Sequence, residues 1–150
     1  MITENRWLHI LGVARQAKRL AEKMRPNDVL FAEDMFLLGM LHDFGYEFTE
    51  NGKDHAAAGA EILKRQGYKN WKIIAEHGNP EIKEMSDALF ILNCADMTVS
   101  AEGKNCTMEE RIAGIAERYG NNSPAFTKAV TAAGRRLPLS PYQHRLTNVF

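Results

Sequence analysis

Histidine and aspartate side chains occupy positions at which a helix would bury them. His9 falls on the same helical stripe as Val13, and Asp96 shares a stripe with Leu92 in the most apolar stretch of the chain. An ionisable group that is buried without a partner costs free energy, so such positions are rare in soluble helices. These residues are therefore the first candidates for chemistry.

Further histidines extend this pattern. His42 and Asp43 close an apolar stretch, His55 stands near the start of a helical segment, and His77 stands at the end of another. Each residue alone has an ordinary explanation, such as a hydrogen-bonded core histidine, a helix cap or a solvated surface position. One shared cation explains the buried polar groups together, and mixed imidazole and carboxylate ligands suit Fe, Mn, Co, Ni or Zn. We therefore expect one or two divalent transition-metal ions.

The elements that must position these residues are helical. Apolar residues recur at helical spacing, and no stretch shows the alternation typical of a strand. The sequence predicts an all-α, single-domain bundle of about six to seven helices. The expected helices cover approximately residues 4–24, 31–42, 54–66, 70–77, 86–99 and 107–119, with a seventh after Ser123-Pro124.

Three local motifs refine these boundaries. Thr107 and Glu110 have the spacing of a capping box. Asn51-Gly52 is a turn motif in the polar segment that follows the second helix. Gly45 is expected to stop that helix in a left-handed turn, which glycine adopts readily.

The bulk composition excludes several classes of protein. Of 150 residues, 45% are hydrophobic and 25% are charged, which is typical of a soluble globular domain. Lys plus Arg and Asp plus Glu both number 19, so no net charge favours nucleic acid or membrane. With two cysteines and no signal-like or membrane-length apolar run, we expect a reduced, cytoplasmic protein. We assign residues 1–136 to a helical domain and residues 137–150 to a tail. The sequence leaves open whether the protein forms a homodimer.

The ordered set of candidate ligands resembles a known family. Arg6 to Val13, Leu37 to Asp43 and Asn93 to Asp96 are similar to the segments that carry the His, His-Asp and Asp signature of the HD superfamily of metal-dependent phosphohydrolases. The resemblance covers roughly residues 6–120. It implies a helical fold and hydrolysis of phosphate esters or anhydrides.

The remaining histidines resemble those of a two-metal subgroup, which includes the symmetrical diadenosine tetraphosphatases. The resemblance implies that Asp43 bridges two metals and that His55 and His77 bind the second. It implies that the first is bound by His9, His42 and Asp96. That subgroup carries a lysine where this chain has Tyr46, so either Lys53 supplies the charge or the substrate differs.

We therefore expect an enzyme that hydrolyses a nucleotide or another small phosphorylated compound through a metal-activated water. Asp43 would orient the nucleophile. Arg6 would either grip a phosphate oxygen or form a salt bridge with a carboxylate, and Lys53 would either cover the pocket or be solvated. The alternative is a non-catalytic sensor that binds a metal or a nucleotide.

Overall fold

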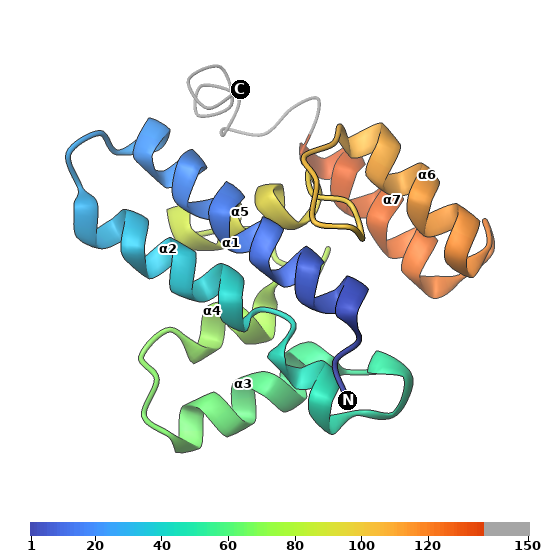
Figure 1. Ribbon diagram of the computed structural model, residues 1–150, viewed down its shortest axis with the longest axis horizontal. Helices are drawn as coiled ribbons and strands as arrows, with labels where there is room; N and C mark the ends of the chain where they lie inside the picture. The colour runs from blue at the N-terminus through green and yellow to red at the C-terminus, as the bar shows by residue number, and fades with distance from the viewer. Residues whose placement is uncertain (137–150) are drawn as a thin grey trace.

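The computed structural model describes residues 1–136, which contain seven α-helices and no β-strand (Figure 1). This confirms the all-α prediction. The helices are α1 (Glu4–Met24), α2 (Val29–Leu41), α3 (His55–Arg65), α4 (Trp71–Glu76), α5 (Asp87–Asp96), α6 (Met108–Tyr119) and α7 (Pro124–Arg136), with 3-10 turns η1 (Phe44–Phe48) and η2 (Glu50–Gly52) after α2. The predicted tail, residues 137–150, and His144 within it lie outside the described residues.

Side chains that cap the helices explain where several of them begin. The hydroxyls of Thr3 and Ser86 and the carboxylate of Asp28 accept hydrogen bonds from backbone N–H groups in the first turns of α1, α5 and α2. Thr107 and Glu110 form the predicted capping box at the start of α6. Such caps satisfy N–H groups that have no partner within the helix.

The main hydrophobic core lies among α1, α2 and α5 and extends to α3 and α4. α1 packs along α2 and against α5, while α3 packs on α4 and on η1 (Figure 1). Fully buried core residues include Leu20 on α1, Leu38 on α2 and Ile91 on α5. Burial of this kind is the dominant favourable term in folding, and here it brings the ends of several helices together.

A smaller hydrophobic cluster attaches the last two helices. Met97, Ile115 and Ala129 form it, with Ile112 and Phe126 packed at its edge. α6 and α7 pack on each other and form a separate pair at the right of Figure 1. The two helices thereby stand across from η2 and the start of α3, with the ends of α1 and α5 between them.

Two sequence-based expectations differ from the structure. The fifth helix ends at Asp96 rather than near residue 99, because the hydroxyl of Thr98 bonds the Cys94 carbonyl and Val99 pairs with Asn105. Gly45 does not adopt a left-handed conformation, and α2 ends earlier, at Leu41. Gly45 is instead required for packing, since a β-carbon there would collide with the carbonyl oxygen of His55.

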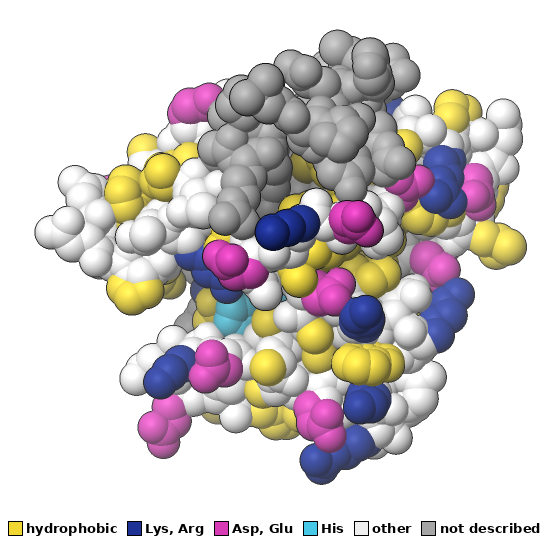
Figure 2. All heavy atoms as spheres, turned by 180° about the vertical axis from the view of Figure 1, so that it is seen from behind, with side chains coloured by type: hydrophobic (Ala, Val, Ile, Leu, Met, Phe, Trp, Pro, Cys, Tyr) yellow, Lys and Arg dark blue, Asp and Glu magenta, His cyan; other side chains and the backbone are white. Residues whose placement is uncertain are grey.

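Within residues 1–136, no helix has the length and apolar character needed to cross a membrane. Seen from behind, the surface has a hollow in which a histidine side chain is visible (Figure 2). The hollow lies on the side of the molecule that carries α6 and α7.

Candidate metal centre

Five helices deliver their ends to one place. The converging residues are His9 of α1, His42 and Asp43 after α2, His55 at the start of α3, His77 after α4 and Asp96 at the end of α5. His9, His42, Asp43 and His77 are buried, whereas the side chains of His55 and Asp96 are 20% and 23% exposed. The structure thus brings all six sequence-predicted ligands together.

Hydrogen bonds to the backbone orient all four imidazoles in the same way. The Nδ1 atoms bond carbonyl oxygens, His42 to Gly39 at 2.7 Å, His55 to Gly52 at 2.9 Å, His77 to Ile74 at 2.6 Å and His9 to Ser100 at 2.9 Å. A carbonyl only accepts, so Nδ1 carries a proton and Nε2 faces the centre, where it can bind a metal when it is not itself protonated. Such hydrogen bonds are typical of metal-binding histidines.

The ligand atoms form two groups that share one carboxylate. His9, His42 and Asp43 form the first group, and Asp43, His55 and His77 form the second, with ligand atoms within 4.8 Å of one another in each. Asp43 Oδ2 lies 3.4 Å from His42 Nε2, whereas Oδ1 lies 3.2 Å from His55 Nε2 and 3.8 Å from His77 Nε2. Each carboxylate oxygen therefore faces a different group.

Asp96 extends the first group. Its Oδ1 lies 3.0 Å from His9 Nε2 and 4.0 Å from His42 Nε2. Burial would raise the pKa of Asp96, but His9, His42 and Arg111 hold it well below its usual range. The carboxylate is therefore ionised and can act as a ligand at neutral pH.

The environment of His42 indicates that a metal fits the centre. Its Nε2 is buried and has no hydrogen-bond partner among the described residues. Burial lowers the pKa of His42 to about 4, against the opposing pull of Asp43 and Asp96. An unpaired buried polar atom costs about 1–3 kcal/mol, and a metal ion would satisfy this one. The mixed nitrogen and oxygen donors also suit a divalent transition metal.

The charge of Asp43 is balanced by its neighbours. Burial would raise its pKa, but His42, hydrogen bonds with His55 and His77, and the charge of Arg6 hold the pKa of Asp43 well below its usual range. In turn, Asp43 raises the pKa of His77 although burial would lower it. The shared carboxylate is ionised and surrounded by nitrogen atoms.

Two arginines contact the carboxylates of the centre. Arg6 Nη1 lies 2.6 Å from Asp43 Oδ2, so the structure shows the salt bridge that the sequence left open. Arg111 Nη2 lies 3.5 Å from Asp96 Oδ1 and 3.3 Å from His9 Nε2. Arg111 was not predicted. It shares the buried face of α6 with Ile115, so the rule that identified His9 would also have found it.

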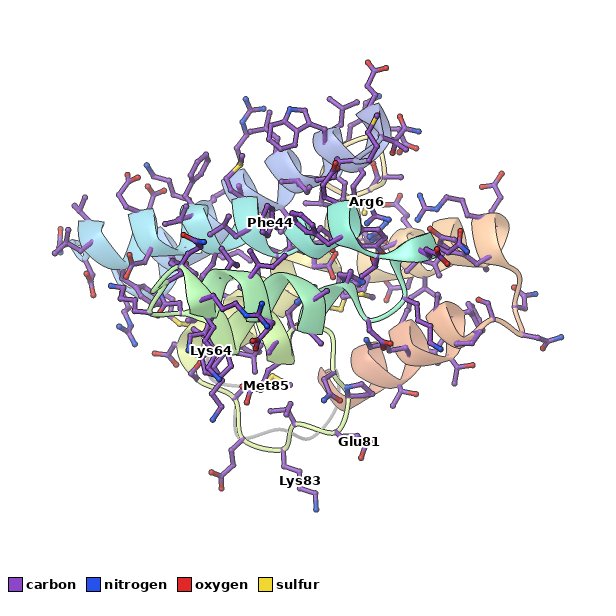
Figure 3. The ribbon with its side chains drawn as sticks, turned by 90° about the horizontal axis from the view of Figure 1, so that it is seen from below. Arg6, Phe44, Lys64, Glu81, Lys83 and Met85 are labelled. Carbon is purple, nitrogen blue, oxygen red and sulfur yellow. The ribbon has the colours of Figure 1, made fainter. Side chains whose placement is uncertain are left out.

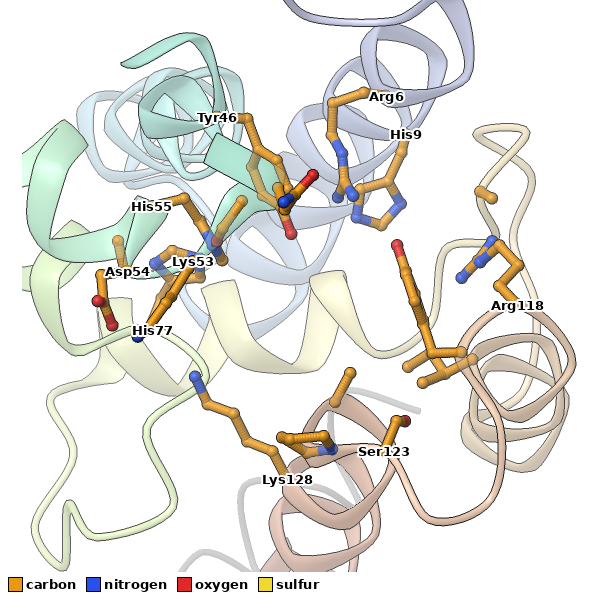
Figure 4. Close-up of a pocket in the computed structure, with 18 of the residues that line it drawn as sticks. Arg6, His9, Tyr46, Lys53, Asp54, His55, His77, Arg118, Ser123 and Lys128 are labelled. Atoms are coloured by element: carbon orange, nitrogen blue, oxygen red, sulfur yellow. The ribbon is translucent and has the colours of Figure 1, made fainter. Parts of the chain in front are cut away.

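A cavity of about 930 Å³ opens beside the centre (Figure 4). It lies between η2, the start of α3 and the α6–α7 pair, and Arg6, Lys53, His55 and His77 line it. Tyr46 is also in its wall and packs on His55, with ring centroids 4.2 Å apart. Burial raises the pKa of Tyr46 to about 12, so its phenol stays protonated at neutral pH.

A model of the HD domain family matches residues 6–122. The chain belongs to the HD domain family. No curated protein and no solved structure matches it. Every candidate ligand of this HD domain lies within the matched residues, as does the whole of α6. α7, which forms part of the cavity wall, begins only after the match ends.

Proposed function

We propose that this HD domain is a metal-dependent phosphohydrolase that acts on a nucleotide or another small phosphate ester or anhydride. The observation that carries the proposal is the position of Asp43, whose two oxygens face two separate groups of imidazole nitrogens beside an open cavity. Two adjacent metal positions are characteristic of phosphate-cleaving centres. The family, whose members are generally hydrolases, supports the same reaction class.

Each of the two ligand groups would hold one metal ion. His9, His42, Asp43 and Asp96 would hold one ion, while His55 and His77 would hold a second together with Asp43. Fe, Mn, Co, Ni or Zn suits these donors. When bound, such an ion would lower the pKa of water and stabilise negative charge on phosphoryl oxygens.

The chain's own residues would position the substrate. Arg6 keeps Asp43 ionised and also reaches the cavity, where its guanidinium lies 3.9 Å from the Tyr46 ring centroid. Tyr46 would donate a hydrogen bond to a phosphate oxygen without neutralising it. Lys53 would supply a positive charge from the connection before α3. Asp43 would orient the attacking water through its ionised carboxylate.

Metal analysis and a turnover assay test this proposal. Purified protein is analysed for transition metals, loaded with Mn or Fe, and screened against nucleotides and a generic aryl phosphate. We expect one or two ions per chain. In His42→Ala and Asp43→Ala, we expect turnover to fall roughly 100-fold or more, since even residues that only support metal ligands contribute 10–100-fold.

A matched variant controls for general damage. Asp34 is an aspartate on α2 whose side chain is 42% exposed and pairs with Lys69. Asp34→Ala should therefore keep both metal and turnover. Turnover that survives in Asp43→Ala would contradict the proposal. Tight nucleotide binding without turnover would instead support the sensor function, which the tyrosine at position 46 favours because it adds no positive charge.

A further inference from the structure

The cavity wall opposite the metal centre is formed by helices that the candidate ligands do not come from. The residues there include Arg118 and Tyr119 at the end of α6 and Ser123, Pro124 and Lys128 on α7. Figure 4 shows the Lys128 side chain extending from α7 across the cavity toward His77. If the reacting phosphorus lies at the metal centre, the remote parts of the substrate would contact this wall.

Lys128 differs from Arg6 and Arg111 because no carboxylate holds it. Arg6 and Arg111 pair with Asp43 and Asp96. Among the described residues, by contrast, the Lys128 ammonium has no hydrogen bond or ion pair. Its Nζ lies 3.9 Å from the point where a β-carbon on Gly78 would sit, next to His77. Within the described part of the chain, no acidic group neutralises this charge, so it is available to bind an anion.

The sequence around Lys128 keeps this charge uncompensated. No Asp or Glu follows Glu117, whereas five cations do, namely Arg118, Lys128, Arg135, Arg136 and Arg145. The chain as a whole has no net charge, so the side chains after Glu117 carry a net positive charge that acidic residues elsewhere balance. Lys128 thus lacks any acidic neighbour on its own helix.

The start of α7 adds to the same potential. Ser123, Pro124 and Ala125 line the cavity, and the Ser123 hydroxyl accepts a hydrogen bond from the Phe126 N–H. The first turn of a helix carries partial positive charge, which favours a phosphate. Because Pro124 has no N–H and Ser123 accepts the N–H groups of Phe126 and Thr127, the turn contributes this charge rather than a row of free donors. Lys128 follows one turn later along the same helix. Both features point to an anionic group.

We propose that Lys128 and the first turn of α7 bind a second phosphoryl group of the substrate, so that the preferred substrates carry two phosphates, as nucleoside diphosphates do. This inference rests on the proposed function, because it assumes that the first phosphoryl group lies at the His and Asp centre. Lys128 then selects the substrate rather than taking part in the reaction.

Ligand binding by full-length, metal-loaded protein tests the proposal by calorimetry. The probes are orthophosphate and methylenediphosphonate, whose P–C–P bridge cannot be hydrolysed. We expect wild-type protein to bind the diphosphonate more tightly than orthophosphate, and Lys128→Gln to reduce that ratio roughly tenfold, the effect of about 1.4 kcal/mol from one charged hydrogen bond. Lys128→Arg should retain the ratio.

Lys83→Gln provides the matched control. Lys83 projects into solvent from the connection between α4 and α5, away from the cavity (Figure 3), so its variant should bind both probes as wild type does. An unchanged ratio in Lys128→Gln, or equal weakening of both probes, would overturn the proposal. Binding is measured without turnover, so this test is separate from the test of the hydrolase function. If the protein shows the expected binding ratios but no hydrolase activity, the hydrolase function would be rejected and the proposed subsite would stand.

Discussion

The proton on each imidazole of the centre is fixed by the backbone. For His42, His55 and His77, the carbonyl that binds Nδ1 belongs to the residue three positions earlier. This spacing is a property of the local chain, so these three rings are oriented by the turn on which they stand. His9 is the exception, since its carbonyl partner, Ser100, lies 91 residues away.

The burial of His42 predicts a pH dependence in metal-free protein. Its pKa is about 4 in the folded state, against 6.5 for an unperturbed histidine, so between these pH values the unfolded chain binds a proton that the folded chain does not. Stability should therefore fall as the pH decreases from 6.5 to 4, by about 3 kcal/mol from this residue. Denaturant unfolding in the presence of a chelator measures the effect.

His42→Phe isolates this contribution. The raised pKa of His77 acts with the opposite sign, because its stabilisation is lost as the pH rises, but His77 is present in both proteins. The difference in unfolding free energy between wild type and His42→Phe should change across this pH range. Parallel pH profiles would contradict the prediction.

At the scale of elements, α1 and α2 approach closely at Gly39. A β-carbon there would collide with the Cα of Ala14 and lie 2.8 Å from its backbone nitrogen. We expect Gly39→Ala to lower the unfolding free energy by about 1–3 kcal/mol, because a packed backbone cannot easily shift. Thermal and denaturant unfolding measure this.

The control is a glycine in an open helical position. A β-carbon at Gly114, in α6, would meet nothing within 4 Å. Gly114→Ala should therefore raise stability by about 0.5–1 kcal/mol through the better helix propensity of alanine. Equal effects at Gly39 and Gly114 would show that the close approach of α1 and α2 does not constrain the fold.

The sequence predicted the elements better than their ends. α1 and the capping box of α6 follow from local patterns and were predicted correctly. The end of α5 was not, because a hydrogen bond from Thr98 and the pairing of Val99 with Asn105 replace its last turn. These contacts depend on how the following loop packs, which periodicity does not encode.

His9, His42 and Asp96 are conspicuous as ionisable residues in an apolar pattern, whereas the ligand roles of His55 and His77 were implied by the family resemblance. Arg111 obeys the same rule and was overlooked. Lys128 could not have been found in this way, since it is exposed, and lysine on a helix surface is ordinary. Its position depends on the packing of α7 through Ala129 and Met97, which only the tertiary structure reveals.

At the scale of the whole molecule, the centre joins five helices, so an ion bound there should stabilise the entire domain. At a free concentration 1,000 times its dissociation constant, a ligand adds about 4 kcal/mol, or roughly 10 °C in Tm for a chain of this size. We expect a chelator to lower the Tm of metal-loaded wild-type protein by roughly 10 °C. The Tm of the Asp43→Asn variant should not respond to the chelator. A Tm that is insensitive to chelator would contradict the prediction.

His9 and Asp96 hydrogen-bond although 87 residues separate them. A ribosome that has released only the first helices would therefore expose an incomplete set of candidate ligands. Any ion captured at that stage would be held by fewer donors and would exchange quickly with its surroundings. Metal selection would consequently be postponed until α5 has emerged from the exit tunnel, and it would reflect the ions that the finished domain encounters.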